Sequence, residues 1–134
     1  HMRPTSPLRT LEMLESGINI LKENPGTDSV RGMCEPSQNP YKMWSIEKDG
    51  YAKPLIQSDI AEQYNQPRQK LPVVYWQNGY VDITRTKTIM EKNSMTGRRI
   101  RPLIVSASHI IDIDNEFTFK MAELMYQKMC NSLK

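Results

Sequence analysis

The sequence contains few of the residues on which nucleophilic and redox catalysis depend. Two histidines and two cysteines occur among 134 residues, and one of the histidines is His1. His109 is the single internal histidine, so a histidine-based catalytic triad has little to draw on. Cys34 and Cys130 lie far apart and fit no metal-binding or redox spacing. We therefore expect two reduced thiols in a cytoplasmic protein.

Long apolar runs and a strong net charge are also missing. No stretch approaches the roughly 20 apolar residues of a membrane helix, so we expect no membrane partner. The net charge of +3 is too small to indicate a nucleic-acid partner, and the basic run 97–101 is interpreted as a solvated turn. The length suits one domain. The hydrophobic fraction of 38% is slightly low and favours a chain that packs against a partner.

Helical patterns mark both ends of the chain. In the first, Ser6 is expected to cap a helix that has Pro7 at its first position and that ends before the NPG turn. Its apolar residues share one face: Leu11, Leu14, Ile18 and Leu21. In the second, Asn115 is expected to cap a helix that has Glu116 in its first turn. Its apolar stripe is interpreted as core: Phe117, Met121, Leu124, Met125 and Met129.

The middle of the chain reads as strands, turns and a hairpin. We expect a buried strand over 28–35, a strand over 73–84 with a break at Asn78–Gly79, a short helix ending at Gly97, and an extended segment over 101–114. Segments 42–46 and 51–56 flank EKDG as a hairpin, and one helical turn precedes Pro67. The exposed aromatic residues of the hairpin indicate either an oligomerisation arm or a hairpin folded onto its own domain. Strands alternating with helices predict an α/β fold.

The stretch HIIDIDNE places Asp112 and Asp114 within an apolar run. In a strand these aspartates share one face, while His109, Ile111 and Ile113 share the other. Neighbouring carboxylates repel each other unless a cation lies between them, and Mg²⁺ binds one or two carboxylates together with phosphate oxygens. The pattern therefore fits a metal site. Taken alone, however, the stretch favours the simpler interpretation of a strand with a solvated acidic face.

Four stretches together resemble one enzyme family. They are RPTSPLR (3–9), NPYK (39–42), PRQKLPVVYWQNG (67–79) and IIDIDN, which contains both aspartates. Their order and spacing resemble the acylneuraminate cytidylyltransferases, or CMP-sialic acid synthetases. The resemblance implies a Rossmann-like nucleotide-diphosphosugar transferase fold. It also implies transfer of CMP from CTP to a nonulosonic 2-keto acid sugar, release of pyrophosphate, assistance by Mg²⁺ and a dimer whose arms reach the neighbouring site.

The resemblance assigns roles residue by residue. Asp112 and Asp114 match the catalytic, metal-binding aspartates. Arg68 matches an arginine that holds the carboxylate of the sugar through its planar fork, although a surface ion pair would explain it too. The other substrate-binding positions are Gln69, Asn78, Lys42, Thr5, Ser6 and Arg9. Three of these have simpler explanations: Asn78 can serve the turn at Gly79, Lys42 can be a solvated lysine, and Ser6 can be a helix cap.

The chain departs from the family pattern at three places. Arg3 stands where glutamine is common, Asp82 stands where tyrosine is common, and NSMTG (93–97) replaces a common aromatic pair. Because these positions belong to the sugar side of the site in relatives, we hypothesise a different acid sugar, such as a legionaminic- or pseudaminic-like one.

The chain also lacks the first strand and the Gly-rich basic loop that would cradle the triphosphate. Residues 1–2, which are His-Met, are expected to be a cloning remnant. Residues 3–134 would be the C-terminal part of one cytidylyltransferase domain, with 39–66 as an oligomerisation arm. We expect this part to be inactive alone and to form a homo-oligomer. The alternative is a non-catalytic oligomerisation or sugar-binding module of the same fold.

Overall fold

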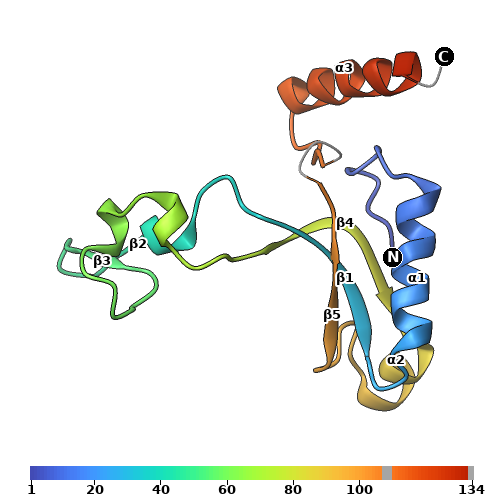
Figure 1. The fold of residues 1–134 in the computed structure, drawn as a ribbon, viewed down its shortest axis with the longest axis horizontal. Coiled ribbons are helices and arrows are strands. Elements are labelled where there is room, and N and C mark those ends of the chain that lie inside the picture. The colour runs from blue at the N-terminus through green and yellow to red at the C-terminus, as the bar shows by residue number, and fades with distance from the viewer. Residues whose placement is uncertain (107–109, 133–134) are drawn as a thin grey trace. The chain divides into compact units, whose positions relative to one another are not determined.

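The computed structural model describes residues 1–106 and 110–132 (Figure 1). His109, which the strand pattern places beside Ile111 and Ile113, lies outside the described residues. The chain divides into two compact units. We call residues 1–34 with 77–134 the sheet unit, and residues 35–76 the hairpin unit. No described helix is long and apolar enough to cross a membrane.

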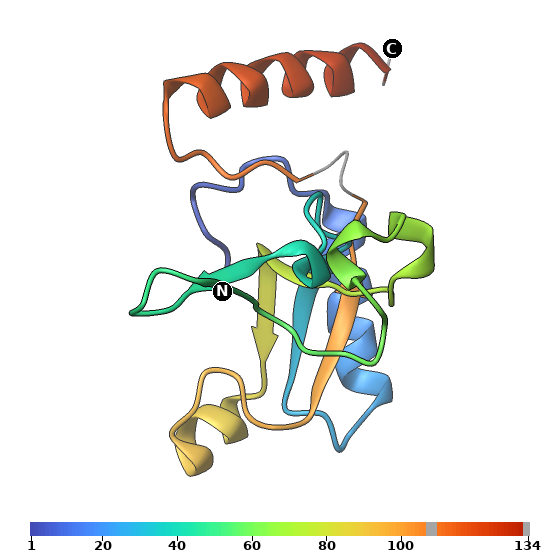
Figure 2. The same cartoon turned by 90° about the vertical axis from the view of Figure 1, so that its left-hand side faces the viewer.

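The sheet unit is a mixed α/β structure, as the alternating pattern predicted. Its strands are β1 (Ser29–Cys34), β4 (Trp76–Thr84) and β5 (Ile100–Ile104), in the order β4-β1-β5 (Figure 2). Its helices are α1 (Leu11–Glu23), α2 (Thr86–Lys92) and α3 (Glu116–Ser132). Strands β1 and β5 are parallel, in a register that runs from Ser29 opposite Ile100 to Met33 opposite Ile104. The end of β4 meets the start of β1, because Arg85 N donates to Asp28 O over 3.1 Å.

The core lies between the sheet and α1. Its buried apolar residues come from all three strands and the residue after β5: Val30, Tyr80, Val81, Leu103 and Val105. At Gly17 the helix approaches the sheet so closely that a Cβ would lie 2.7 Å from Ile83 Cδ1. The absence of a side chain at Gly17 therefore sets the distance between α1 and the sheet.

Helix α1 begins later than predicted, and the face that it turns toward the core differs from the predicted one. Thr10 caps it, with Oγ1 accepting from Met13 N over 3.3 Å, so the predicted cap at Ser6 is wrong. The predicted apolar face is wrong in part: Leu14 and Leu21 pack against the core, but Leu11 is 70% exposed and Ile18 is 41% exposed. The face that packs on the core is centred on Gly17: Met13, Leu14, Gly17, Ile20 and Leu21. The close approach at Gly17, which hydrophobic periodicity cannot detect, fixes the rotation.

Helix α3 has the predicted cap but not the predicted core face. Asn115 Oδ1 accepts from Thr118 N over 3.0 Å, which confirms the cap. The apolar stripe is largely exposed, with Phe117 at 72% and Leu124 at 60% exposure, while Ala122 is the buried residue of the helix. The interpretation of the stripe as core is therefore wrong for Phe117, Met121 and Leu124, whereas Met125 and Met129 are half-buried.

Three further boundaries differ from expectation. Strand β4 continues through Gly79, whose φ of +69° bends the backbone without ending the strand. Helix α2 ends at Lys92, followed by the left-handed cap residue Asn93, and not at Gly97. Among the described residues of the extended segment, strand structure is limited to β5, and residues 110–114 are not part of a strand.

The hairpin unit contains the predicted hairpin. Strands β2 (Trp44–Ile46) and β3 (Ala52–Pro54) pair antiparallel, and Gly50 has a φ of +87° in the turn between them. Three 3₁₀ turns complete the unit: η1 (Pro40–Lys42), η2 (Gln63–Asn65) and η3 (Arg68–Lys70). Turn η2 is the single helical turn expected before Pro67. The ring of Trp44 lies 4.5 Å from that of Tyr64, yet Trp44 remains 44% exposed. An oligomerisation role for this unit stays a prediction.

Candidate functional site

The N-terminal segment 3–9 is fastened to strand β4 through Arg9. The Arg9 guanidinium donates to Tyr80 O and to Arg3 O, and Thr10 N donates to Tyr80 Oη over 2.8 Å. Partial burial lowers the pKa of Arg9, and Tyr80 raises it in part. A guanidinium stays protonated in proteins even so. Arg9 therefore positions the segment, and its donors face backbone carbonyls.

The same segment meets two other predicted motifs. Thr5 O accepts from Ile113 N over 2.8 Å, which ties it to the stretch that carries both aspartates. Arg3 lies against Gly79, where a Cβ would be 3.1 Å from Arg3 Cδ. The positive φ and the missing side chain of Gly79 allow this approach. Stretches 3–9, 78–80 and 112–114, which are distant in sequence, are thereby joined within the sheet unit.

Buried polar atoms without hydrogen-bond partners concentrate on the predicted site residues. Among the described residues, four buried side-chain atoms lack a partner: Ser6 Oγ, Arg31 Nε, Asn78 Nδ2 and Asp112 Oδ1. Three of them belong to residues that the motifs selected. Buried polar atoms are normally paired, and an unpaired one costs roughly 1–3 kcal/mol. These three atoms are therefore candidates for contact with a ligand or an ion.

Asn78 serves the backbone and the candidate site at once. Its side-chain carbonyl Oδ1 accepts from Tyr80 N over 3.0 Å, which is the turn role considered from the sequence. The residue is only 2% exposed, so this hydrogen bond fixes the side-chain amide. The amide NH₂ group is consequently held in a buried position with its hydrogen atoms unused.

The two aspartates occupy different environments. Asp112 is half-buried, whereas Asp114 is exposed, and its backbone N donates to Thr118 Oγ1 over 3.0 Å. Residues 110–114 form no strand, so the strand pleating from which a shared face was predicted is not present. The unpartnered Oδ1 of Asp112 fits a hard cation, which favours carboxylate oxygen. The described residues contain no cluster of three His, Cys, Asp or Glu side chains. A cation here would therefore complete its coordination with water or substrate oxygens.

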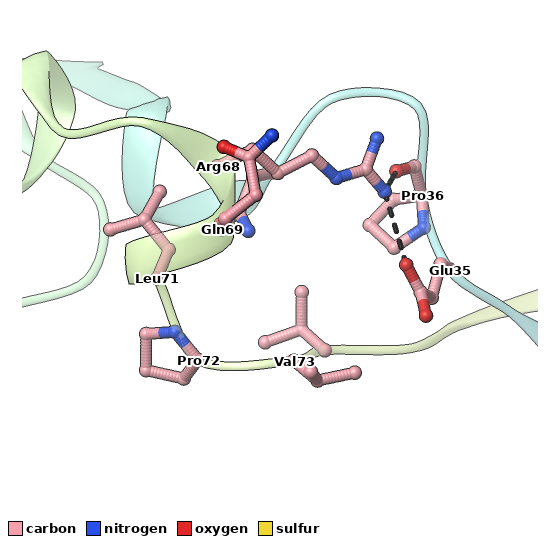
Figure 3. A pocket seen from close by; sticks show the side chains of 9 residues that line it. Glu35, Pro36, Arg68, Gln69, Leu71, Pro72 and Val73 are labelled. Carbon is pink, nitrogen blue, oxygen red and sulfur yellow. Dashed lines mark hydrogen bonds and ion pairs between the residues drawn. The ribbon is translucent and has the colours of Figure 1, made fainter.

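The hairpin unit contains the pocket that carries Arg68 and Gln69. This hollow of about 200 Å³ is also lined by Glu35, Asn39 and a wall of apolar residues (Figure 3). Arg68 Nη2 lies 3.4 Å from Glu35 Oε2 and donates to Pro36 O over 2.8 Å. The Arg68 side chain is 49% exposed, so this ion pair contributes little to stability. The surface ion pair considered from the sequence is thus present, and carboxylate binding by Arg68 stays a prediction.

Lys42, like Arg68, has both a structural explanation and a predicted role in substrate binding. It is exposed in η1, and its backbone N donates to Asn39 O over 2.9 Å. Within the part of the chain that the structure describes, its ammonium group makes no ion pair. The solvated-lysine reading and the substrate-binding reading both fit this arrangement.

Sequence reasoning missed a buried ion pair that joins two departures from the family pattern. Arg31 Nη1 lies 2.6 Å from Asp82 Oδ2, and both side chains are buried. Arg31 Nη2 also donates to Met95 O over 2.7 Å and to Thr96 Oγ1. Asp82 and the 93–97 loop are therefore linked through one guanidinium. The sequence did contain an indication of this pair: Arg31 lies within the predicted buried strand, and a buried charge requires a partner of opposite charge.

Comparisons with known proteins support the motif reading. No family model matches the sequence. A curated protein from Legionella pneumophila, CMP-N,N'-diacetyllegionaminic acid synthase, is 28% identical to the chain over 128 residues. The match covers 94% of the chain and 52% of the relative, so the chain spans about half the length of that relative. This similarity confirms the resemblance predicted from the four stretches.

Proposed function

We propose that the chain is the sugar-binding and metal-binding part of a cytidylyltransferase that transfers CMP from CTP to a nonulosonic acid. One observation carries the proposal. Ser6, Asn78 and Asp112 each hold a buried polar atom without a partner among the described residues, and hydrogen bonds and packing join the three segments on which they lie. The name of the Legionella relative supports a legionaminic-like acid. The proposal includes a Rossmann-like fold for the complete domain, of which 3–134 would be the C-terminal part.

The proposed roles follow from the chemistry of each side chain. Asp112 and Asp114 would hold Mg²⁺, which when bound would neutralise charge that develops on phosphate oxygens. The Asn78 amide and the Ser6 hydroxyl would donate to polar groups of the substrate. Arg9 would hold the Thr5–Ser6 backbone in place.

In the hairpin unit, Arg68 would exchange its weak contact with Glu35 for the carboxylate of the acid sugar, a geometry that suits two parallel hydrogen bonds. Gln69 lines the same pocket and would add an amide contact. Lys42 would contribute positive charge near the anionic substrates.

The proposed reaction is a displacement at phosphorus. The anomeric hydroxyl of the acid sugar attacks the α-phosphate of CTP and gives its proton to solvent, a new oxygen–phosphorus bond forms, and the bond to the β-phosphate breaks to release pyrophosphate. The chain described here has no Gly-rich loop for the triphosphate, so we expect it to bind the sugar without transferring CMP when it is alone.

The test is CMP transfer by the complete protein that carries this chain, with CTP, Mg²⁺ and a panel of nonulosonic acids. We expect Asp112→Asn and Asp114→Asn to abolish transfer. Asp59→Asn, which removes an exposed carboxylate of the hairpin unit, is the charge-matched control and should retain transfer. A protein that is inert with every acid would contradict the proposal. An Asp112→Asn variant as active as the control would do so too.

The second candidate is a non-catalytic module of the same fold. It is favoured by the use of Asp82 and Arg68 in contacts within the chain. Such a module would bind an acid sugar with the complete protein present yet never release pyrophosphate. Calorimetric titration of the sugar acid beside the transfer assay separates the two candidates.

A further inference from the structure

A second hollow lies in the sheet unit at the amino ends of β1 and β5. It is formed by the turn 23–27 after α1 and by residues 98–101, and it encloses about 540 Å³. This volume is within the usual range for small-molecule pockets, roughly 300–1,000 Å³. Residues 110–114, which carry the predicted aspartates, lie beyond the opposite ends of these strands (Figures 1 and 2). The hollow is therefore distinct from the candidate site described above.

The lining of this hollow carries excess positive charge. Arg98, Arg99 and Arg101 line it, and Glu23 is the one acidic residue among the lining residues. Among the described residues, none of these three guanidinium groups makes an ion pair or a side-chain hydrogen bond. The exposed arginines thus present unneutralised charge to a concave surface.

Asp28, a buried acid that contacts this loop, does not neutralise the arginine side chains. Its Oδ1 lies 2.5 Å from Lys92 Nζ. Its Oδ2 accepts from the backbone N of Arg98 and of Arg99 over 2.9 and 3.0 Å. Asp28 therefore fixes the backbone of both arginines and leaves their side chains free for an anion.

Close packing holds one of these arginines in place. A Cβ at Gly26 would lie 2.7 Å from Arg99 Nη1, so the missing side chain lets the guanidinium rest on the turn. At Gly97, which directly precedes Arg98, φ is +71° and a Cβ would lie 2.3 Å from Asp28 Cβ. Only glycine suits this position. A pre-ordered loop loses less entropy when it binds a ligand.

We propose that this hollow binds a phosphate-bearing small molecule. Guanidinium groups match phosphate oxygens with two parallel hydrogen bonds, and three of them against one carboxylate give a net attraction for an anion. The proposal goes beyond the proposed transferase function, because none of the residues assigned to that function lines this hollow.

The test is calorimetric titration of the chain with inorganic tripolyphosphate, the probe for the phosphate chemistry. We expect saturable binding that weakens at higher salt. Arg98→Gln and Arg101→Gln should each lower the affinity at least about tenfold, since a charge-assisted hydrogen bond is lost. Glu23→Gln should raise the affinity, because it removes the opposing charge. Arg99 is left intact because it packs against Gly26.

The matched control is Lys87→Gln, which removes one positive charge from the exposed face of α2. If this control weakens binding as much as Arg98→Gln does, net charge explains the effect and the proposal is wrong. Absence of saturable binding would also overturn it. If a single-stranded oligonucleotide binds with the same arginine dependence while tripolyphosphate does not, the hollow is part of a nucleic-acid surface and the small-molecule proposal fails.

Discussion

The ion pair between Arg31 and Asp82 permits a quantitative stability prediction. The two side chains are only 7% and 5% exposed, and the charged atoms are 2.6 Å apart. Removing one partner of a buried pair leaves an uncompensated charge away from water, which typically costs about 3–5 kcal/mol. Asp82→Asn keeps the size and one oxygen of the side chain, so it isolates the loss of charge.

The remaining contacts of Arg31 set the expected magnitude. Its Nη2 keeps Met95 O and Thr96 Oγ1 as neutral acceptors. We therefore expect the lower end of the range, about 3 kcal/mol, which is a large part of the 5–15 kcal/mol that stabilises a typical domain. Replacing both residues, as Arg31→Met with Asp82→Leu, should restore much of the loss because no buried charge remains.

The assay is urea unfolding followed by far-ultraviolet circular dichroism, with the free energy of unfolding extrapolated to water. The matched control is Glu91→Gln, which breaks the exposed pair with Lys87, whose side chains are 61% and 73% exposed. That pair should contribute at most about 1 kcal/mol. If Asp82→Asn lowers the free energy of unfolding no more than Glu91→Gln does, burial of the pair does not govern its energy and the reasoning fails.

Three further predictions concern local structure. The hydrogen bonds to Asp28, that from the Lys92 ammonium first, hold the pKa of this carboxyl well below its usual range. The folded pKa is thus below the unfolded value of about 3.9, so the stabilisation is complete above about pH 4 and is lost as the pH falls further. Asp28→Asn should therefore reduce the fall of Tm with decreasing pH below about pH 4. Gly97→Ala should destabilise more than Gly50→Ala in urea unfolding, because both have positive φ but only Gly97 has a neighbour within reach of a Cβ. Thr10→Ala should cost about 1 kcal/mol in the same assay, and Ser6→Ala less, because Thr10 caps α1.

Local chemistry decided the elements that could be predicted from the sequence. The EKDG turn required glycine at a positive φ, which Gly50 supplies at +87°. Asn115 was predicted as a cap because its short polar side chain can reach the first turn of the following helix, and its Oδ1 does accept from Thr118 N. In each case the decisive contacts lie within a few residues along the chain.

Contacts between distant residues decided the elements that were predicted wrongly. Ser6 and Pro7 have the chemistry of a helix start, but the Arg9 guanidinium binds the carbonyl of Tyr80, 71 residues away, and holds segment 3–9 against β4. The helix therefore starts at Leu11. The candidate site was predictable in the same partial way. Motif spacing selected Ser6, Asn78 and Asp112, but only the packed structure shows that each has a buried polar atom without a partner.

The apolar face of α3 leads to the last prediction. The sequence pattern marks it as a core face, yet Phe117, Met121 and Leu124 are 72%, 40% and 60% exposed. Burying a large apolar side chain contributes about 1.5–3 kcal/mol, so a helix with this face is stabilised by association. We expect the chain to self-associate with increasing concentration in sedimentation velocity, and Leu124→Glu to weaken the association by placing a charge in the interface. Glu123→Gln, at an exposed position of the same helix, is the control. If Leu124→Glu and Glu123→Gln sediment like the unchanged chain at every concentration, α3 is not the associating surface and the prediction is wrong.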